Sequence, residues 1–178
     1  PGLDAPLLQP YRIAGDAHAN DDSAFPYAAT SRTRINGLGA SGISFINTGR
    51  GRDLGSALLS LDTRGVTELA VTWTAQTLAP NIRVYAIRLQ ARDGLHGAWQ
   101  DVLVDGSPVE YLREASAGPE VVIGPVTLGS EWEELEHVQL QWRYYHVSGN
   151  SGARAQLRLD DITVTSSGAT STAAALAI

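Results

Sequence analysis

The chain has 178 residues, a formal net charge of −6 and 43% hydrophobic residues. This length suits one domain with its own core, and the apolar content excludes a wholly disordered chain. No apolar run approaches the ~20 residues that a membrane-spanning helix requires. The net negative charge argues against non-specific binding to DNA or RNA. We therefore expect a globular domain with neither a membrane span nor a nucleic-acid partner.

The sequence contains no cysteine and no methionine, and all 13 basic residues are arginine. The lack of cysteine excludes disulfides, thiolate catalysis and cysteine-ligated zinc sites. Because no starting methionine is present, we expect a processed product or one domain of a larger multidomain protein. The exclusive use of arginine reflects either codon usage or a need for planar, bidentate contacts that lysine does not make.

The apolar pattern divides the chain into three zones. Residues 1–33 predict an irregular N-terminal segment, and residues 34–165 carry nearly all of the periodic pattern. Residues 166–178 have mostly small side chains, and they predict a linker or disordered tail, with a short helix over 173–178 as the alternative.

Within the middle zone, apolar and polar residues alternate as they do in half-buried strands. In chain order, strands are predicted at 43–47, 57–62, 69–76, 85–90, 102–104, 109–112, 120–123, 138–145 and 156–165. Turn residues separate these segments, and only 130–137 is compatible with a helix. Many short strands without helical partners predict an all-β fold, a two-sheet antiparallel β-sandwich of jelly-roll type.

The alternation also assigns faces. Trp73 and Trp142 fall on the apolar phase of their strands and are predicted to be core residues. The opposite phase predicts solvent-facing positions at Thr72, Thr74, Arg88, Gln90, Gln139, Gln141, Arg143, Tyr145, Gln156 and Arg158. Their amide, guanidinium and hydroxyl groups suit hydrogen bonding to sugar hydroxyls or carboxylates, and Trp99 and Tyr145 offer rings for stacking on a sugar. The alternative is an ordinary solvated strand surface. The predicted ligand-binding residues are Arg88, Gln90, Trp99, Gln141, Arg143 and Tyr145.

The last predicted strand changes phase. Leu157 and Leu159 keep a period of two, as do Ile162 and Val164, but the two pairs are out of step at Asp160-Asp161. A β-bulge there would absorb one residue and turn both apolar pairs to the core. It would also leave two adjacent carboxylates beside a buried strand, where a metal ion is one good partner.

An oxygen-rich cluster precedes the sandwich. Asp16, Asn20, Asp21 and Asp22 are residue types that calcium prefers, although their spacing does not fit an EF-hand loop. Two interpretations stay open: a solvated acidic loop, or a calcium site in which some of Asp16, Asp21 and Asp22 meet Asp160 or Asp161.

Other motifs carry little chemistry. The run Gly37-Leu38-Gly39-Ala40-Ser41-Gly42 matches a dinucleotide-binding pattern, but a strand rather than a helix follows it, so a glycine-rich loop is predicted. The four histidines lack metal-ligand spacing, and no nucleophile elbow occurs. Glu131, Glu133, Glu134 and Glu136 predict a solvated acidic face.

Three segments in this order, residues 31–34, 42–49 and 157–164, resemble the jelly-roll domains appended to secreted bacterial enzymes and surface proteins. These domains are related in form to MAM-like domains and to calcium-containing carbohydrate-binding modules. The resemblance implies that a carboxylate of the last strand, Asp160 or Asp161, helps to hold a structural calcium ion near the N-terminal part of the chain.

The resemblance and the polar strand positions together lead to our first hypothesis: a non-catalytic, secreted or extracellular module that binds a polysaccharide or other glycan and contains structural calcium. An adhesion or spacer domain that binds protein or no ligand is the alternative. A small hydrolase on the same scaffold is a weaker one, because a fold does not determine function.

Overall fold

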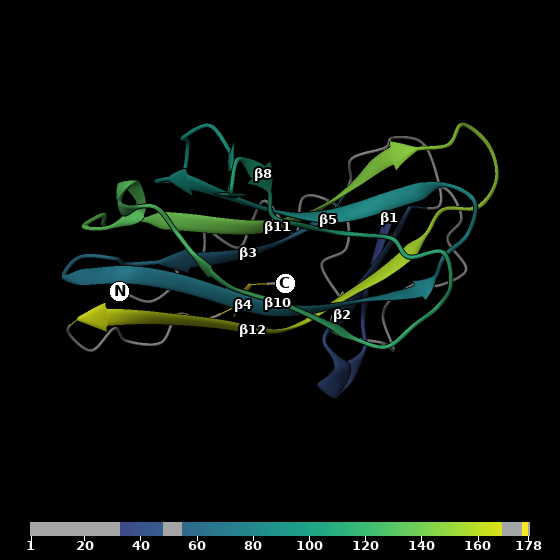
Figure 1. Cartoon of the computed structure of the whole chain (residues 1–178), viewed down its shortest axis with the longest axis horizontal. Helices are drawn as coiled ribbons and strands as arrows, with labels where there is room; N and C mark the ends of the chain where they lie inside the picture. The colour runs from purple at the N-terminus through teal and green to yellow at the C-terminus, as the bar shows by residue number, and fades with distance from the viewer. Residues whose placement is uncertain (1–32, 48–54, 169–175, 178) are drawn as a thin grey trace.

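In a computed structural model of the chain, which describes residues 33–47, 55–168 and 176–177, the strands form two facing antiparallel sheets (Figure 1). The five-stranded sheet has the order β1 (Thr33–Gly37), β2 (Ile43–Asn47), β12 (Gln156–Gly168), β4 (Val66–Ala79) and β10 (Val121–Thr127). The six-stranded sheet has the order β13 (Leu176–Ala177), β3 (Ser56–Leu61), β11 (Val138–Ser148), β5 (Val84–Asp93) and β6 (Gln100–Asp101), and β9 (Glu110–Leu112) also pairs with β5. The predicted all-β sandwich is confirmed.

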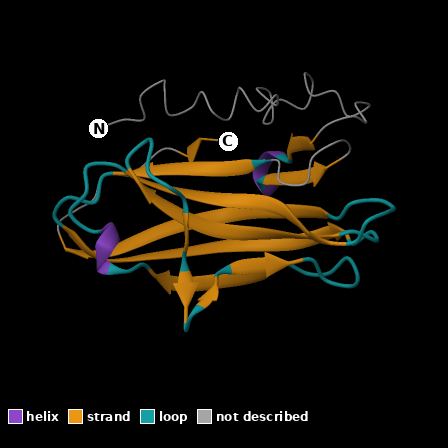
Figure 2. Cartoon of the chain, turned by 90° about the horizontal axis from the view of Figure 1, so that it is seen from above, coloured by secondary structure: helices purple, strands orange, loops and turns teal. Residues whose placement is uncertain are grey.

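The chain passes back and forth between the sheets. Strands β2, β4, β10 and β12 lie in the five-stranded sheet, and β3, β5, β9 and β11 lie in the six-stranded sheet. The last long strand, β12, therefore inserts between β2 and β4, which are far earlier in the chain. This alternation is the winding of a jelly roll. Figure 2 shows that strands make up most of the described chain and that the helical turns are short.

The core lies between the two sheets. Trp73 of β4 and Trp142 of β11 are fully buried, as the alternation predicts. The rings of Tyr144 and Tyr85 stack at 4.6 Å, and Phe45 of the opposite sheet stacks on Tyr144 at 5.7 Å. The Tyr144 hydroxyl donates to the carbonyl of Ala155 at 2.7 Å, so the one polar atom of this ring is satisfied. Aromatic packing thus joins the two sheets at these residues.

Several element bounds differ from the predicted ones. β12 continues to Gly168, beyond the predicted boundary at residue 165, and β13, inside the predicted tail, pairs with β3. Thr33, the last residue of the predicted N-terminal segment, begins β1. The rest of that segment, and the tail apart from 166–168 and 176–177, lie outside the described residues. Within the helix-compatible stretch 130–137, only the 3-10 turn η2 (Ser130–Trp132) is helical, because the backbone is extended at Glu133. No helix in the described ranges is long and apolar enough to cross a membrane.

Candidate functional site

The residues predicted to bind a ligand lie together on or beside the outer face of the six-stranded sheet. On β5 the residues of one phase, such as Leu89, are buried in the core, so Arg88 and Gln90 point to the opposite side. Across the sheet, Arg88 is in register with Arg143 of β11, and Gln90 is in register with Gln141. We call this outer face the polar face. It comprises Arg88, Gln90, Arg92, Trp99, Asp101, Glu110, Gln139, Gln141, Arg143 and Tyr145.

Arg88 lies at the centre of the polar face and uses all three of its nitrogen atoms. Nε donates to Glu110 Oε2 at 2.9 Å, Nη1 to Asp101 Oδ2 at 2.8 Å, and Nη2 to the Tyr145 hydroxyl at 2.7 Å. The Tyr145 hydroxyl in turn donates to Glu110 Oε2 at 2.5 Å. The guanidinium carbon also lies 4.8 Å from the centroid of the Tyr145 ring. Such charge-assisted bonds hold each planar group in a fixed orientation.

Two glutamines extend this network along the sheet. Gln141 Nε2 donates to Gln90 Oε1 at 2.6 Å, and Gln90 Nε2 donates to Asp101 Oδ1 at 2.7 Å. The prediction that Gln90 and Gln141 face solvent is wrong, because their exposed fractions are 8% and 6%. Gln139, only 2% exposed, is buried as well. The alternation identified the correct face, but neighbouring side chains on that face cover these amides.

A second set of contacts lies beside the first. Arg92 donates to Gln139 Oε1 from Nε at 2.8 Å and from Nη2 at 2.5 Å, and Gln139 Nε2 donates to the Ser60 hydroxyl at 3.0 Å. The Arg92 guanidinium lies 4.3 Å from the ring centroid of Trp99, a cation–π contact. Trp99 is half-buried, so the indole is held against Arg92 while part of it stays accessible.

Asp101 and Glu110 are functional candidates that the sequence interpretation did not name. They lie at the two ends of a hairpin whose arms are β7 (Leu103–Val104) and β8 (Ser107–Pro108). Its turn residues, Asp105 and Gly106, both have positive φ, as a two-residue type I′ turn requires. The Asp-Gly pair is the sequence feature that would have found the site. A tight turn there places residues 101 and 110 opposite each other.

The hairpin is fixed to β5 by backbone hydrogen bonds. Val102 N donates to Leu89 O at 3.2 Å, Leu89 N to Val109 O at 2.9 Å, and Val109 N to Val102 O at 2.8 Å. Asp101 and Glu110 therefore face Arg88 from the edge of the sheet. Their side chains are 29% and 27% exposed and that of Arg88 is 26% exposed, so the cluster is reachable from solvent.

Tyr145 remains a neutral hydroxyl in this setting. Burial, and then the hydrogen bond to the Glu110 carboxylate, raises the pKa of Tyr145 to about 12. A phenol with such a pKa donates and accepts hydrogen bonds near neutral pH, and it is a poor general base. Tyr145 thus offers hydrogen bonding and ring contact rather than proton abstraction.

The other predicted solvent-facing positions, Thr72, Thr74, Gln156 and Arg158, lie on the outer face of the five-stranded sheet. Thr74 and Arg158 are buried, so the solvent-facing prediction is wrong for both. Arg158 donates to the Ser41 carbonyl at 2.6 Å and pairs with the carboxylates of Glu120 and Asp160. This arginine joins β12 to the loop between β1 and β2 and to the segment before β10, which is a structural role.

The predicted bulge in β12 is confirmed. Asp160 is in register with Thr74 and Thr163 with Thr72, so β12 has one residue more than β4 between these pairs. Asp161 has φ 50°, and after it Ile162 and Val164 pack against the core. The bulge lines a small recess between the sheets together with Gly42, Ile43, Ala57 and Leu159.

The described residues do not by themselves form a calcium site. Asp160 is ion-paired with Arg158, and the Asp161 carboxylate accepts a long hydrogen bond of 3.4 Å from Thr74. Within the described ranges, no three acidic or histidine side chains are grouped as metal ligands. Calcium takes six to eight oxygen atoms, so these two carboxylates do not make a site alone. Asp16, Asp21 and Asp22 lie outside the described residues, and the calcium site stays a prediction.

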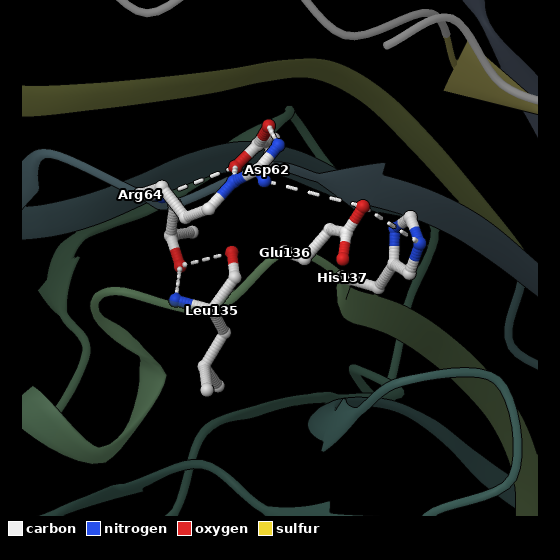
Figure 3. A network of polar contacts seen from close by, with 6 residues as sticks. Asp62, Arg64, Leu135, Glu136 and His137 are labelled. Carbon is white, nitrogen blue, oxygen red and sulfur yellow. Dashed lines mark hydrogen bonds and ion pairs between the residues drawn. The ribbon is translucent and has the colours of Figure 1, made fainter.

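The acidic run before β11 contacts the turn between β3 and β4, and Figure 3 shows Glu136 beside Arg64 and His137. The Glu134 carboxylate accepts the backbone N–H of Gly65 at 3.1 Å, and that of Glu133 accepts the N–H of Glu68 at 2.9 Å. The buried Thr63 hydroxyl donates to Leu135 O at 3.2 Å and accepts from Leu135 N at 3.1 Å. Glu131, Glu134 and Glu136 are exposed, as the solvated interpretation predicts, and Glu133 is half-buried. The carboxylates of Glu133 and Glu134 also fix the start of β4 and the turn before it.

The glycine-rich run is a loop, as predicted. It forms the 3-10 turn η1 (Gly39–Ser41) between β1 and β2. Gly42 has φ 72°, and a Cβ there would lie 2.4 Å from Leu159 O and 2.7 Å from the Asp160 carboxylate. The motif therefore serves close packing against β12 rather than nucleotide binding.

Comparisons of the chain with protein-family models, with curated proteins and with solved structures find no match.

Proposed function

We propose that this protein is a non-catalytic module that binds a glycan on the polar face. The observation that carries the proposal is the network around Arg88, in which two carboxylates and a phenol converge on one guanidinium at the edge of the sheet. Side chains that hydrogen-bond to one another on strands keep their orientation before a ligand arrives, which reduces the entropy lost on binding. Sugars present closely spaced hydroxyl groups, and such groups suit a fixed set of polar partners.

The rings on this face support the same proposal. Tyr145 and Trp99 each contact an arginine, Arg88 and Arg92, and each keeps part of its surface accessible. The apolar surface of a sugar ring packs well on a side chain of this kind. Between the positions of Ala86 and Arg92 on β5, the polar face extends about 20 Å along the strands. A face of that length suits a chain of sugars better than a single one.

The arrangement of the two carboxylates favours binding over hydrolysis. Glycoside hydrolysis needs two carboxyl groups that flank a bond of the substrate. Here Arg88 lies between Asp101 and Glu110 and bonds to both, so the space between the two acids is occupied by the protein itself. An extracellular location, a multidomain parent protein and a structural calcium ion belong to the same proposal and rest on the sequence resemblance.

Affinity electrophoresis tests the proposal. The full chain is run in native gels that contain single polysaccharides, and at least one of them is expected to retard it. Truncation of the accessible ring in Trp99→Ala is expected to weaken retardation about tenfold, about 1.4 kcal/mol. Ile82→Ala is the matched control, because Ile82 is apolar, 71% exposed and outside the polar face. If no polysaccharide of a broad panel retards the chain, or if both variants behave alike, the proposal is wrong.

A further inference from the structure

The arginines of the polar face are already engaged. Arg88 donates to Asp101, Glu110 and Tyr145, and Arg92 donates twice to Gln139 and stacks on Trp99. Arg143 has an interaction partner as well. A carboxylate or sulfate on a ligand would have to compete with Asp101 and Glu110 for Arg88, which lies between them. Displacement from Arg88 would leave a partly buried carboxylate without its cation, which is costly.

The carboxylates, in contrast, keep acceptor capacity. An ionised carboxylate has about four lone-pair directions. The two oxygen atoms of Asp101 accept one bond each, from Gln90 and Arg88. On Glu110 the bonds from Arg88 and Tyr145 all go to Oε2. With one guanidinium between two carboxylates, the cluster of Arg88, Asp101 and Glu110 has one net negative charge, although Arg92 and Arg143 bring positive charge to the rest of the polar face. The groups that such a cluster gains most from are O–H donors.

From these two observations we infer that the cluster of Arg88, Asp101 and Glu110 selects neutral, hydroxyl-rich glycans over anionic ones, with the carboxylates of Asp101 and Glu110 as acceptors for sugar hydroxyl groups. This inference rests on the proposed function and names its ligand class. At this cluster the specificity also comes from repulsion, since a uronate or sulfate would approach the like charges of Asp101 and Glu110.

The test compares polysaccharides of two charge classes in the same gels at equal ionic strength. The neutral class comprises β-glucan, xylan, mannan and galactan, and the anionic class comprises polygalacturonate and alginate. The chain is expected to bind at least one neutral polysaccharide. It is expected to bind every anionic polysaccharide at least tenfold more weakly than that one. Binding that is tightest to polygalacturonate or alginate and is lost with added salt would overturn the inference while leaving glycan binding intact. Absence of any retardation would overturn both.

Two variants locate the effect. Asp101→Asn and Glu110→Gln keep the size of each side chain but replace one acceptor oxygen by a donor, and each is expected to weaken binding of the neutral glycan about tenfold. Glu136→Gln is the control, because Glu136 is an exposed acid outside the polar face. Thermal unfolding of each variant separates a lost contact from a lost fold. The comparison of polysaccharides with the unmodified chain does not depend on either variant. Unchanged affinity in both folded variants would contradict the role of the carboxylates.

Discussion

Asp101 comes directly before and Glu110 directly after one hairpin, and both accept hydrogen bonds from the same guanidinium, that of Arg88. The tight Asp105-Gly106 turn fixes the distance between the two arms, and the bonds of Leu89 to Val102 and Val109 fix the hairpin to β5. The position of both acids is therefore set by backbone structure. Arg88 closes the arrangement by balancing one of the two charges and by orienting Tyr145.

Replacing the central arginine is expected to destabilise the fold. Arg88→Leu leaves Asp101 and Glu110 close together without a cation and removes three charged hydrogen bonds, so we expect a loss of about 2–3 kcal/mol in the free energy of unfolding. Urea unfolding at neutral pH measures this loss. Arg64→Leu is the control, because Arg64 also pairs with an acid, Asp62, but is exposed. Its effect is expected to be much smaller. Equal effects would show that the network around Arg88 does not stabilise the fold.

The fold was predictable where burial imposes a period on the sequence. Trp73 and Trp142 alternate with polar residues because each long strand has one core-facing side, and both are fully buried. The phase change at Asp160-Asp161 predicted the bulge for the same reason, since Leu157, Leu159, Ile162 and Val164 all meet the core. An apolar residue on the wrong face would cost more than an irregularity in the ladder.

The candidate site was predictable only in part. Arg88 and Tyr145 lie on long strands, and their phase placed them on the correct face. Asp101 and Glu110 belong to β6 and β9, which are two and three residues long. Strands this short show no alternation. The burial of Gln90 also escaped the pattern, because it comes from hydrogen-bonded neighbours on the same face rather than from the core. Periodicity reports which side a residue faces and not what covers that side.

The loop between β1 and β2 provides a test of close packing. Gly42→Ala places a methyl group 2.4 Å from Leu159 O at a residue with positive φ, so both a clash and backbone strain oppose it. Gly39→Ala in the same loop also has positive φ (62°), but nothing lies within 4 Å of the added group. Gly39→Ala is expected to cost about 1 kcal/mol, and Gly42→Ala clearly more.

Thermal or urea unfolding of the two alanine variants makes the comparison, and their difference reports the contact with β12 together with the backbone conformation of Gly42, φ 72° and ψ −134°. A cost for Gly42→Ala no larger than that for Gly39→Ala would show that the loop does not pack on the bulge as described.

The pair of Asp62 and Arg64 predicts a pH dependence at acid pH (Figure 3). The hydrogen bond from the Arg64 side chain, and then that from its backbone N–H, lowers the pKa of Asp62 from 3.8 to about 2. A carboxyl group whose pKa is lower in the folded state stabilises the fold above its unfolded pKa, and this contribution is lost as the pH falls through the folded pKa. The contribution of Asp62 is therefore complete above about pH 4 and lost towards pH 2.

Urea midpoints of the wild-type chain and of Asp62→Asn, measured from pH 6 down to pH 2, check this expectation. The wild type is expected to be the more stable at pH 6, and the difference is expected to shrink between pH 4 and pH 2. Thr67→Ala is a control on the same part of the molecule that removes a side-chain hydrogen bond without removing a charge. A difference between wild type and Asp62→Asn that stays constant over the whole range would contradict the assignment.

Calcium binding is tested most directly by the stability of the full chain. A ligand that binds only the folded state raises the unfolding temperature by mass action. We expect calcium at millimolar concentration to raise the midpoint of thermal unfolding relative to the chelated protein. The triple variant Asp16→Asn, Asp21→Asn and Asp22→Asn is expected to lose the shift, because it removes the predicted calcium ligands that would complete the site with Asp160 and Asp161. Magnesium is the control ion, since it demands shorter bonds and a stricter geometry.

The outcome also decides what the bulge does. Asp161→Asn keeps the size of the side chain and an acceptor oxygen at an exposed residue that forms no ion pair with another described residue. Without calcium it is therefore expected to leave the unfolding temperature nearly unchanged. If Asp161 is a calcium ligand, this variant loses stability only in the presence of calcium. A thermal midpoint that is identical with calcium and after stringent chelation, in the wild-type chain, would remove the metal from the proposal. In that case the bulge serves only to restore the apolar phase of β12, and the pairing of Asp160 with Arg158 is the complete account of that carboxylate.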